Sequence, residues 1–552
     1  MLPSELKGVM RQLLEQFQHL HRLSGSPDAE RSVDILCEIL AARQILVKRE
    51  RCALYLSDPL AASVTLADET EWRIAAKTRS FSANCPQGVE AELVYDARSL
   101  AFIAENAFPA WAAKVQGKIV VADQGYEEYV QRLMRAGALG LIHIWGSAEQ
   151  ALHEETVGPI WGTPVPNDRL RYPTLPVAAI NQQQGKMLLQ RMQQATQTAR
   201  LTTEVREHVA ACSLPVVEIA GESEEFILLS SHYDSWHEGV TDNATGNALC
   251  LAMAIFFAQQ KQPLKRGLRI AWWPGHSNAR YGGSTWYADR YRAELMKHCA
   301  AHINVDSPGC RDGSQLVINA SGAESVAFLN QALLSETGRP ASRITPLGKG
   351  GDQSFWGTDI PLHFALREEP EVRTSLSPGS GGGWWWHTEE DTLDKVDEAN
   401  LWRAANIHGR WLNRLLFEED LPLDTVCYLA SLRDALIQLQ GELDPAFDLQ
   451  QLVLKLTELE KALRRESIAT EQLERIVGLL HRARYRASDD YHPDLSYHGG
   501  AFPGLQLLRG HRREQSDNLC WVMLETQYYR QRDRALELLE KCLLLTAGNA
   551  SL

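Results

Sequence analysis

Histidine and aspartate side chains follow two predicted strands of this sequence, at the point where each strand ends. His232 comes directly after the apolar run 226–231, and Asp306 comes directly after the run 302–305. Functional groups of open α/β sheets collect beyond the carboxyl ends of the strands, so we expect both side chains at one rim of a sheet. Neutral imidazole and carboxylate are nitrogen and oxygen ligands that suit zinc. The sequence therefore predicts a metal site at this rim.

Three further side chains of the same types follow nearby elements. Asp242 opens the helix after the first of these strands, His276 follows the run 267–273, and His387 comes past a glycine-rich loop after the run 360–366. Any one of them alone is more often a loop side chain or a helix cap. Residue type and position coincide at several strand ends, however, and this favours a shared site. The predicted metal ligands are His232, Asp242, Asp306, His387 and His276.

Apolar strands alternate with helices in the part of the chain that must position these side chains. Residues from about 203 to 397 contain the runs named above and one more at 315–320, with helical segments between most of them. This alternation is typical of a mostly parallel sheet covered by helices. We therefore predict an α/β fold for this part of the chain.

The rest of the sequence predicts two additional regions. The segment from about 91 to 200 contains buried-strand runs at 117–123 and 139–145, and it looks like a small module inserted into the α/β domain. Beyond Leu401 strands nearly vanish, and leucines between 449 and 463 recur at helical spacing. The predicted domains are 1–90 and 203–400 as the two parts of the α/β domain, 91–202 as the insert and 401–552 as a helical domain.

Composition and charge exclude several classes of protein. The chain has 552 residues, with 56 Lys and Arg against 70 Asp and Glu, and a formal charge of −14. This acid excess argues against broad binding to nucleic acid or to anionic membranes. No run approaches the roughly 20 apolar residues that span a bilayer, and the amphipathic, acid-containing N-terminus differs from a secretion signal. The ten cysteines are scattered, so we expect buried thiols in the cytoplasm.

Several motifs in this chain resemble those of the M28 family of co-catalytic zinc peptidases. Within the family, the resemblance is to the branch that contains glutamate carboxypeptidase II and the transferrin receptor. The matching motifs are HYDSW (232–236), the Asp242 that follows His232 by ten positions, NVD ending at Asp306, and HTEEDT from His387. Weaker matches are HRLSGSPDAE (21–30), GKGGDQSFW (348–356) and GAFPGL (500–505). The resemblance implies an M28-like α/β domain, a protease-associated insert and a helical domain that forms a homodimer.

The resemblance also implies how the ligands are divided between the metal ions. His232 and Asp306 hold one metal each with Asp242 bridging, or they share one metal between them, and His387 joins the same cluster. The expected cofactor is zinc, as one or two ions. A zinc pair lowers the pKa of a shared water and polarises the scissile carbonyl.

One loop departs from the family pattern. The family carries two adjacent glutamates after the strand that ends here at Trp273, the first a general base and the second a metal ligand. This chain places His276 and Ser277 there, and no glutamate occurs between Arg266 and Tyr291. Three consequences stay open: His276 is a ligand or the general base, one metal is lost or weakly held, or catalysis is lost.

Five further residues are candidates, two for the chemistry and three for substrate binding. Asp234, two residues beyond His232, can orient an imidazole, and Glu389 beside His387 can supply the missing carboxylate as an alternative base. For the substrate we name Tyr497, Arg367 and Trp386. Glutamate-cleaving relatives have a Lys-Tyr pair where this chain has Ser496 and Tyr497, and losing the cation argues against glutamate specificity.

The sequence therefore predicts a zinc-dependent hydrolase of M28 type that cleaves a peptide or a small amide bond. Two alternatives stay open. One is a binding or scaffold protein that has lost catalysis, and the other is a hydrolase restricted to small, non-peptide amides. Turnover of an amide separates an enzyme from a scaffold, and the substrates that turn over separate the two enzymes.

Overall fold

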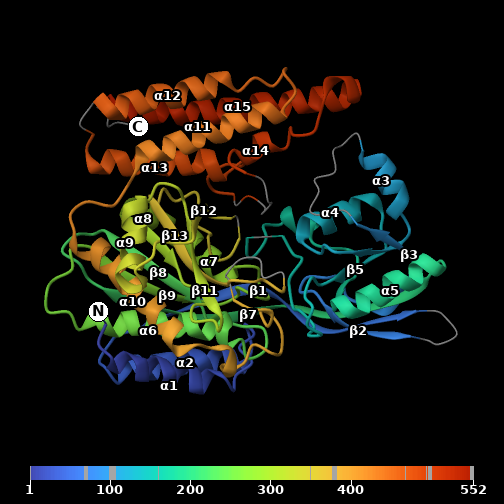
Figure 1. The fold of residues 1–552 in the computed structure, drawn as a ribbon, viewed down its shortest axis with the longest axis horizontal. Helices are drawn as coiled ribbons and strands as arrows, with labels where there is room; N and C mark the ends of the chain where they lie inside the picture. The colour runs from blue at the N-terminus through green and yellow to red at the C-terminus, as the bar shows by residue number, and fades with distance from the viewer. Residues whose placement is uncertain are drawn as a thin grey trace.

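The computed structural model describes residues 2–66, 72–97, 107–159, 161–348, 350–375, 382–465, 468–492, 494 and 500–547. Figure 1 shows three regions: an α/β region with a central sheet at the lower left, a smaller α/β region at the right, and a layer of helices at the top. Helices α1 (Glu5–Phe17) and α2 (Pro27–Ala41) lie along the bottom of the α/β region in this view.

The central strands are parallel and lie side by side in the order β9-β8-β10-β13. Their carboxyl ends therefore meet at one rim, as the alternation of strands and helices predicts. The strands here are β7 (Thr198–Ile219), β8 (Phe226–His232), β9 (Gly267–Trp273), β10 (Cys299–Asn304), β11 (Gly313–Ala320), β12 (Arg343–Pro346) and β13 (Leu362–Pro370).

Helices cover both faces of this sheet, and alternate side chains of each strand pack against them. In β9, Leu268, Ile270 and Trp272 join the core formed with α1, α2, α6 (Thr245–Ala258) and α10 (Glu398–Phe417). Ala271 and Trp273 join the core on the opposite face, with α7 (Gly282–Arg290) and α8 (Arg292–His298). The two-residue period of a strand explains why a run that is apolar throughout serves both cores. The predicted α/β fold is confirmed.

One strand of the predicted set runs against the others. β11 pairs with β13 in antiparallel register, and with β12 in parallel register. The chain between β10 and β11, residues 305–312, holds no crossover helix. A parallel strand needs a crossover of a dozen residues or more, so this short link reverses the chain direction. Helix α9 (Val326–Thr337) then provides the crossover from β11 to β12.

A long two-stranded ribbon connects the α/β region to the smaller region. β1 (Lys48–Leu66) pairs with β7 in antiparallel register along its whole length. Pro59 and a register shift before Ala61 interrupt the pattern, which hides the continuity of the strand in the sequence. The smaller region contains β2 (Arg73–Thr78), β3 (Cys85–Asp96), β4 (Ile119–Ala122), β5 (Gly140–Ile144), β6 (Val177–Ile180), α3 (Phe108–Val115), α4 (Glu127–Ala136) and α5 (Gln182–Gln194).

The C-terminal part of the chain is helical, as predicted from residue 401 onward. Its own hydrophobic core gathers around Tyr428, Leu456, Leu480 and Leu539, whereas α10 packs into the core of the sheet. The helices are α11 (Thr425–Glu442), α12 (Gln450–Arg465), α13 (Thr470–Tyr485), α14 (Pro503–Gln506) and α15 (Asn518–Thr546). The domain boundaries at residues 90, 202 and 400 stay predictions.

Two further expectations concern the whole chain. A search of the described residues finds no helix that is both long and apolar enough to span a bilayer. All ten cysteines lie in the described part of the chain and carry free thiols, most of them buried or partly buried. The reduced compartment predicted from the sequence stays a prediction.

Candidate functional site

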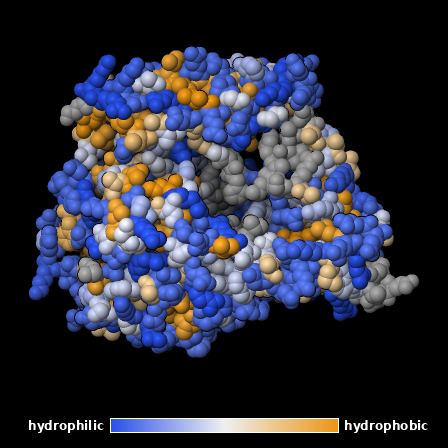
Figure 2. All heavy atoms as spheres, in the orientation of Figure 1, coloured by the Kyte–Doolittle hydropathy of each residue, from blue (hydrophilic) through white to orange (hydrophobic). Residues whose placement is uncertain are grey.

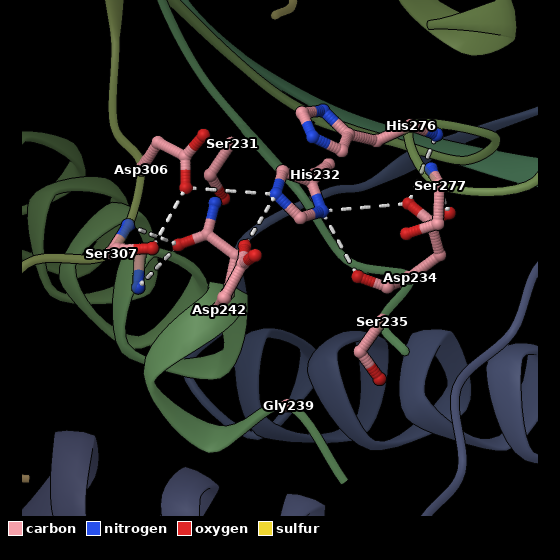
Figure 3. Close-up of polar contacts among 12 residues, drawn as sticks. Ser231, His232, Asp234, Ser235, Gly239, Asp242, His276, Ser277, Asp306 and Ser307 are labelled. Carbon is pink, nitrogen blue, oxygen red and sulfur yellow. Dashed lines mark hydrogen bonds and ion pairs between the residues drawn. The ribbon is translucent and has the colours of Figure 1, made fainter. Parts of the chain in front are cut away.

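The carboxyl end of β8 presents one ring nitrogen of His232 to two aspartates, Asp242 and Asp306 (Figure 3). Its Nε2 lies 3.1 Å from Oδ1 of Asp242 and 3.7 Å from Oδ1 of Asp306. On the other edge of the ring, Nδ1 donates to the backbone carbonyl of Asp234 at 3.0 Å. This hydrogen bond leaves Nε2 without a proton in the neutral ring and directs it at the two carboxylates. The imidazole is 1% exposed.

Asp242 lies between two imidazoles. Its Oδ1 faces His232, and its Oδ2 lies 3.1 Å from Nε2 of His387. The residue sits in a π-helical turn (Val240–Ala244) before α6, where its φ and ψ depart from helical values. Such turns within helices are frequent at functional sites. A single carboxylate that faces two imidazole nitrogens can bridge two metal ions.

Buried hydrogen bonds hold the Asp242 turn in place. The carboxylate of Asp391 accepts the backbone N–H groups of Thr241 and Asp242 at 2.8 and 2.9 Å. The side chain of Asn243 donates to the carbonyl of Val305 at 3.0 Å and accepts the N–H of Ser307 at 3.1 Å. The turn is thereby fixed to the loop that carries Asp306.

The electrostatics of the cluster favour a cation. Burial opposes charge on His232, but Asp234, Asp242 and Asp306 outweigh it and hold the pKa of His232 well above its usual value. Burial likewise opposes ionisation of Asp242, yet His232 and His387 hold the pKa of Asp242 well below its usual value. Beneath them, burial raises the pKa of Asp391 to about 6. A site of this kind stabilises a positive charge between its side chains.

His276 joins the cluster from the loop after β9. Its ring stacks on His232 with 3.7 Å between centroids, and its Nδ1 lies 2.8 Å from Oδ2 of Asp352. The other oxygen of Asp352 accepts the hydroxyl of Ser284 at 2.7 Å. Burial raises the pKa of Asp352, but His276 outweighs this effect and leaves the pKa below its usual value, so the carboxylate is the acceptor. His276 therefore donates through Nδ1 and keeps Nε2 available.

Two segments brace the loops that carry His232 and His276. The carboxylate of Asp234 accepts the backbone N–H groups of His276 and Ser277 at 3.2 and 3.0 Å, so it orients the His276 loop. Arg22, which is fully buried, donates to the carbonyls of Tyr233 and Gly239 at 2.9 and 3.0 Å. Burial lowers the pKa of Arg22 to about 10. The motif at 21–30 is therefore structural support for the site.

The smaller α/β region holds His387 from the opposite side. Nδ1 of His387 donates to the carbonyl of Glu154 at 3.1 Å, and the N–H of Glu154 donates to the carbonyl of His387 at 2.8 Å. Trp386 stacks on the His387 ring with 3.6 Å between centroids. His387 has a φ of +58°, a left-handed backbone that non-glycine residues rarely adopt. These contacts fix that conformation and direct Nε2 at Asp242.

The donors fit a metal ion. Ligand atoms of His232, His276 and Asp306 lie within 4.8 Å of one another, and so do those of His153, Glu155 and His387. The two groups flank Asp242. Nε2 of His232 and Oδ1 of Asp242 are buried, and neither makes a hydrogen bond. Buried polar atoms are costly to leave unpaired, and imidazole with carboxylate is a donor set that zinc accepts.

The remaining predicted residues lie elsewhere. Glu389 is exposed, and no contact between described residues joins it to the cluster. Arg367, which is partly buried, pairs with Glu369 on the same strand. Trp386 contacts a predicted ligand, His387, but it is buried. Tyr497 lies outside the described residues.

Three positions around the site were missed in the sequence. Asp352 stands in the motif at 348–356 and Asp391 in the motif that begins at His387, so both motifs held a signal that was not used. The segment His153–Glu155 carried no signal, because it belongs to a module distant in the sequence and approaches the site only through the fold.

Solved structures share this fold. An aminopeptidase from Aneurinibacillus sp. strain AM-1 matches with a TM-score of 0.57 and 19% identity, covering 76% of this chain and 96% of that one. A peptidase M28 precursor from Shewanella amazonensis SB2B matches with a TM-score of 0.58 and 18% identity, covering 76% and 99%. A zinc aminopeptidase from Bacillus subtilis matches with a TM-score of 0.55 and 19% identity, covering 76% and 97%. The fold of this chain is therefore one that these three proteins share.

One part of this chain, residues 216–411, matches the model of peptidase family M28. It contains Asp242, Asp306, His276 and His387. The mouse aminopeptidase NAALADL1 is 23% identical over 277 residues, which are 44% of this chain. The match spans 36% of that relative's own length, about a third.

Proposed function

We propose that the protein is a zinc-dependent hydrolase that cleaves a peptide or a small amide bond. The observation that carries the proposal is the position of Asp242, whose two carboxylate oxygens each lie 3.1 Å from an imidazole nitrogen. The match of residues 216–411 to a peptidase family model and the fold shared with aminopeptidases support a hydrolase.

The residues that would hold zinc are His232, Asp242, Asp306 and His387. When bound, zinc supplies Lewis-acid polarisation of a carbonyl and a water with lowered pKa. The contribution of the chain is to orient the ligand atoms of these side chains. The backbone carbonyls of Asp234 and Glu154 accept hydrogen bonds from Nδ1–H of His232 and His387. These hydrogen bonds keep both Nε2 atoms available.

His276 is the residue that we assign as general base. Its Nδ1 proton is held by Asp352, and its ring lies against His232 at the edge of the cluster. The free Nε2 can accept a proton from a water molecule near Asp306, because ligand atoms of His232, His276 and Asp306 lie within 4.8 Å of one another. Imidazole can serve as a general base near neutral pH.

A protein that binds metal without turnover is the second candidate. The observation that favours it is the loop from Pro274 to Ser284, which contains no carboxylate. In that case His276 and Asp352 form only a buried structural pair, and the zinc ligands keep the loops in place.

The experiment is a turnover screen of the zinc-loaded protein. The substrates are unblocked dipeptides, N-blocked dipeptides, amino-acid p-nitroanilides and small non-peptide amides. Cleavage of any of them that disappears in the Asp242→Ala variant supports the proposal. If no substrate is cleaved by protein that holds zinc, the metal-binding protein without turnover is the better description. The pattern of blocked and unblocked substrates distinguishes a peptidase from a small-amide hydrolase.

We also propose a homodimer formed through the helical domain, in the cytoplasm. Leu519, Val522 and Met523 are exposed apolar residues at helical spacing on α15, and they support a contact surface. Figure 2 shows apolar side chains within the helical layer at the top of that view. Light scattering at micromolar concentration tests the proposal, since a monomer would contradict it.

A further inference from the structure

The two sides of Asp242 differ in the donors that the α/β region provides. On the Oδ1 side, that region supplies His232, Asp306 and His276. On the Oδ2 side, the described residues of that region supply only His387. A catalytic zinc site normally has three protein ligands and an open position for water. The Oδ2 side is therefore one donor short if only the α/β region is considered.

The smaller α/β region places a carboxylate at this side. Glu155 follows β5 on the loop that holds His387, and it is 7% exposed. Its Oε1 accepts the backbone N–H of Thr156 at 3.0 Å and lies 3.6 Å from Nη1 of Arg280. Its Oε2 lies 3.9 Å from Nδ1 of His387. One oxygen is thus anchored, and the other is turned toward a predicted metal ligand.

His153 lies beside this carboxylate, but its ring is set up to donate a hydrogen bond. Nη1 of Arg79 lies 3.3 Å from Nδ1 of His153 and donates to the His153 carbonyl at 2.7 Å. Because a guanidinium can only donate, Nδ1 accepts and the ring proton sits on Nε2. That Nε2 is buried without a hydrogen-bond partner. A protonated nitrogen cannot bind a metal, but it can donate to a carboxylate or to a water that does.

We infer that Glu155 is a metal ligand contributed by the smaller α/β region. It would complete a second zinc position with Oδ2 of Asp242 and Nε2 of His387. The Nε2–H of His153, which has no hydrogen-bond partner here, could donate to a carboxylate or a water bound there. Ligand atoms of His153, Glu155 and His387 already lie within 4.8 Å of one another. The oxygen that would bind the metal is Oε2, since Thr156 and Arg280 lie at Oε1.

This assignment rests on the proposed function, since it concerns a second ion in the same site. With this assignment, each oxygen of Asp242 is accompanied by one imidazole and one further carboxylate. These are His232 and Asp306 at Oδ1, and His387 and Glu155 at Oδ2. The assignment also gives the smaller region a chemical role, because a zinc position then forms only when that region is docked on the sheet.

Zinc stoichiometry tests the assignment without any substrate. Equilibrium dialysis against zinc compares the full-length wild type with Glu155→Gln and Glu127→Gln. Glu127 is the matched control: it is buried and binds the same Arg280 at 2.7 Å, but it is not among the residues grouped with His387. The inference predicts two zinc ions per chain for the wild type and for Glu127→Gln, and one for Glu155→Gln.

Each other outcome has a defined meaning. If Glu155→Gln retains two ions, or if the wild type holds only one, the inference is overturned while the proposed function stands. If the wild type binds no zinc, the proposed function itself fails. Should Glu155→Gln not fold, anomalous diffraction from zinc-soaked wild-type crystals decides. A Glu155 oxygen at about 2.0–2.2 Å from a zinc ion supports the inference, and two zinc ions without that oxygen overturn it.

Discussion

The two sides of Asp242 are built in different ways. On one side, His232 and Asp306 come from the ends of adjacent parallel strands, and His276 follows the next strand of the same sheet. On the other side, His387 comes from a loop and is held by Glu154 of a separate region. The first side follows from the rule that functional groups collect at the carboxyl ends of parallel strands. The second side depends on how the smaller α/β region docks on the larger one. A search along strand ends therefore finds His387 itself but not the segment of the smaller region that holds it.

Replacing Asp242 tests whether the two sides form one site. Among the described residues, Asp242 is the only carboxylate that faces both imidazoles. Asp242→Ala removes it, so zinc binding and amide turnover should both fall by more than about 100-fold. Even groups that merely support metal ligands cost 10–100-fold when removed. Zinc titration calorimetry and kcat/KM measure the effect. A variant that keeps one tightly bound zinc ion would show that one side holds a metal without the bridge.

Replacing His276 tests the chemistry of the strand-end side. We expect His276→Ala to lower kcat by about 100-fold or more, with little change in zinc content, because a general base contributes roughly 10²–10⁴-fold. Single-turnover rates and elemental analysis of the same sample separate the two effects. Loss of zinc together with activity would instead identify His276 as a ligand, and normal kinetics would make it structural.

Asp352→Asn, which changes the partner of His276, should lower kcat less than His276→Ala does. Burial lowers the pKa of His276, but Asp352 helps to hold it above its usual value. Removing that charge should lower the pKa of the base, so the acidic limb of the kcat profile shifts to lower pH. We expect kcat at the optimum to fall about 10-fold, since the ring loses the acceptor that orients it. If kcat falls but the acidic limb of its pH profile does not shift, Asp352 acts only on folding.

Glu389→Gln should have the smallest effect. The side chain is exposed, and surface substitutions away from special features change little. We expect kcat/KM and zinc content to stay within about 2-fold of the wild type. A loss of 100-fold would show that Glu389 turns inward and acts as the base in place of His276.

The sequence predicted the α/β fold and the strand-end residues for a clear reason. The runs that became β8 and β9 are apolar throughout, as expected for strands covered on both faces, and polar residues follow them directly. The antiparallel direction of β11 was not predicted, because residue pattern alone does not report chain direction. It follows from the short link at residues 305–312.

The parts of the site that were missed depend on contacts over long sequence separations. Asp352 is 76 positions from His276, and Glu154 is 233 positions from His387. No local periodicity or spacing relates such pairs. They become visible only when the ribbon of β1 and β7 places the smaller region beside the rim of the sheet.

The central claim is that this cluster of imidazoles and carboxylates binds zinc. Elemental analysis after zinc loading and exhaustive buffer exchange tests it most directly, on the wild type and on the double variant His232→Ala/Asp306→Ala. We predict stoichiometric zinc in the wild type and a clear loss in the variant, which should keep the same circular dichroism spectrum. Metal-free wild type, or equal zinc in both proteins, would contradict the claim.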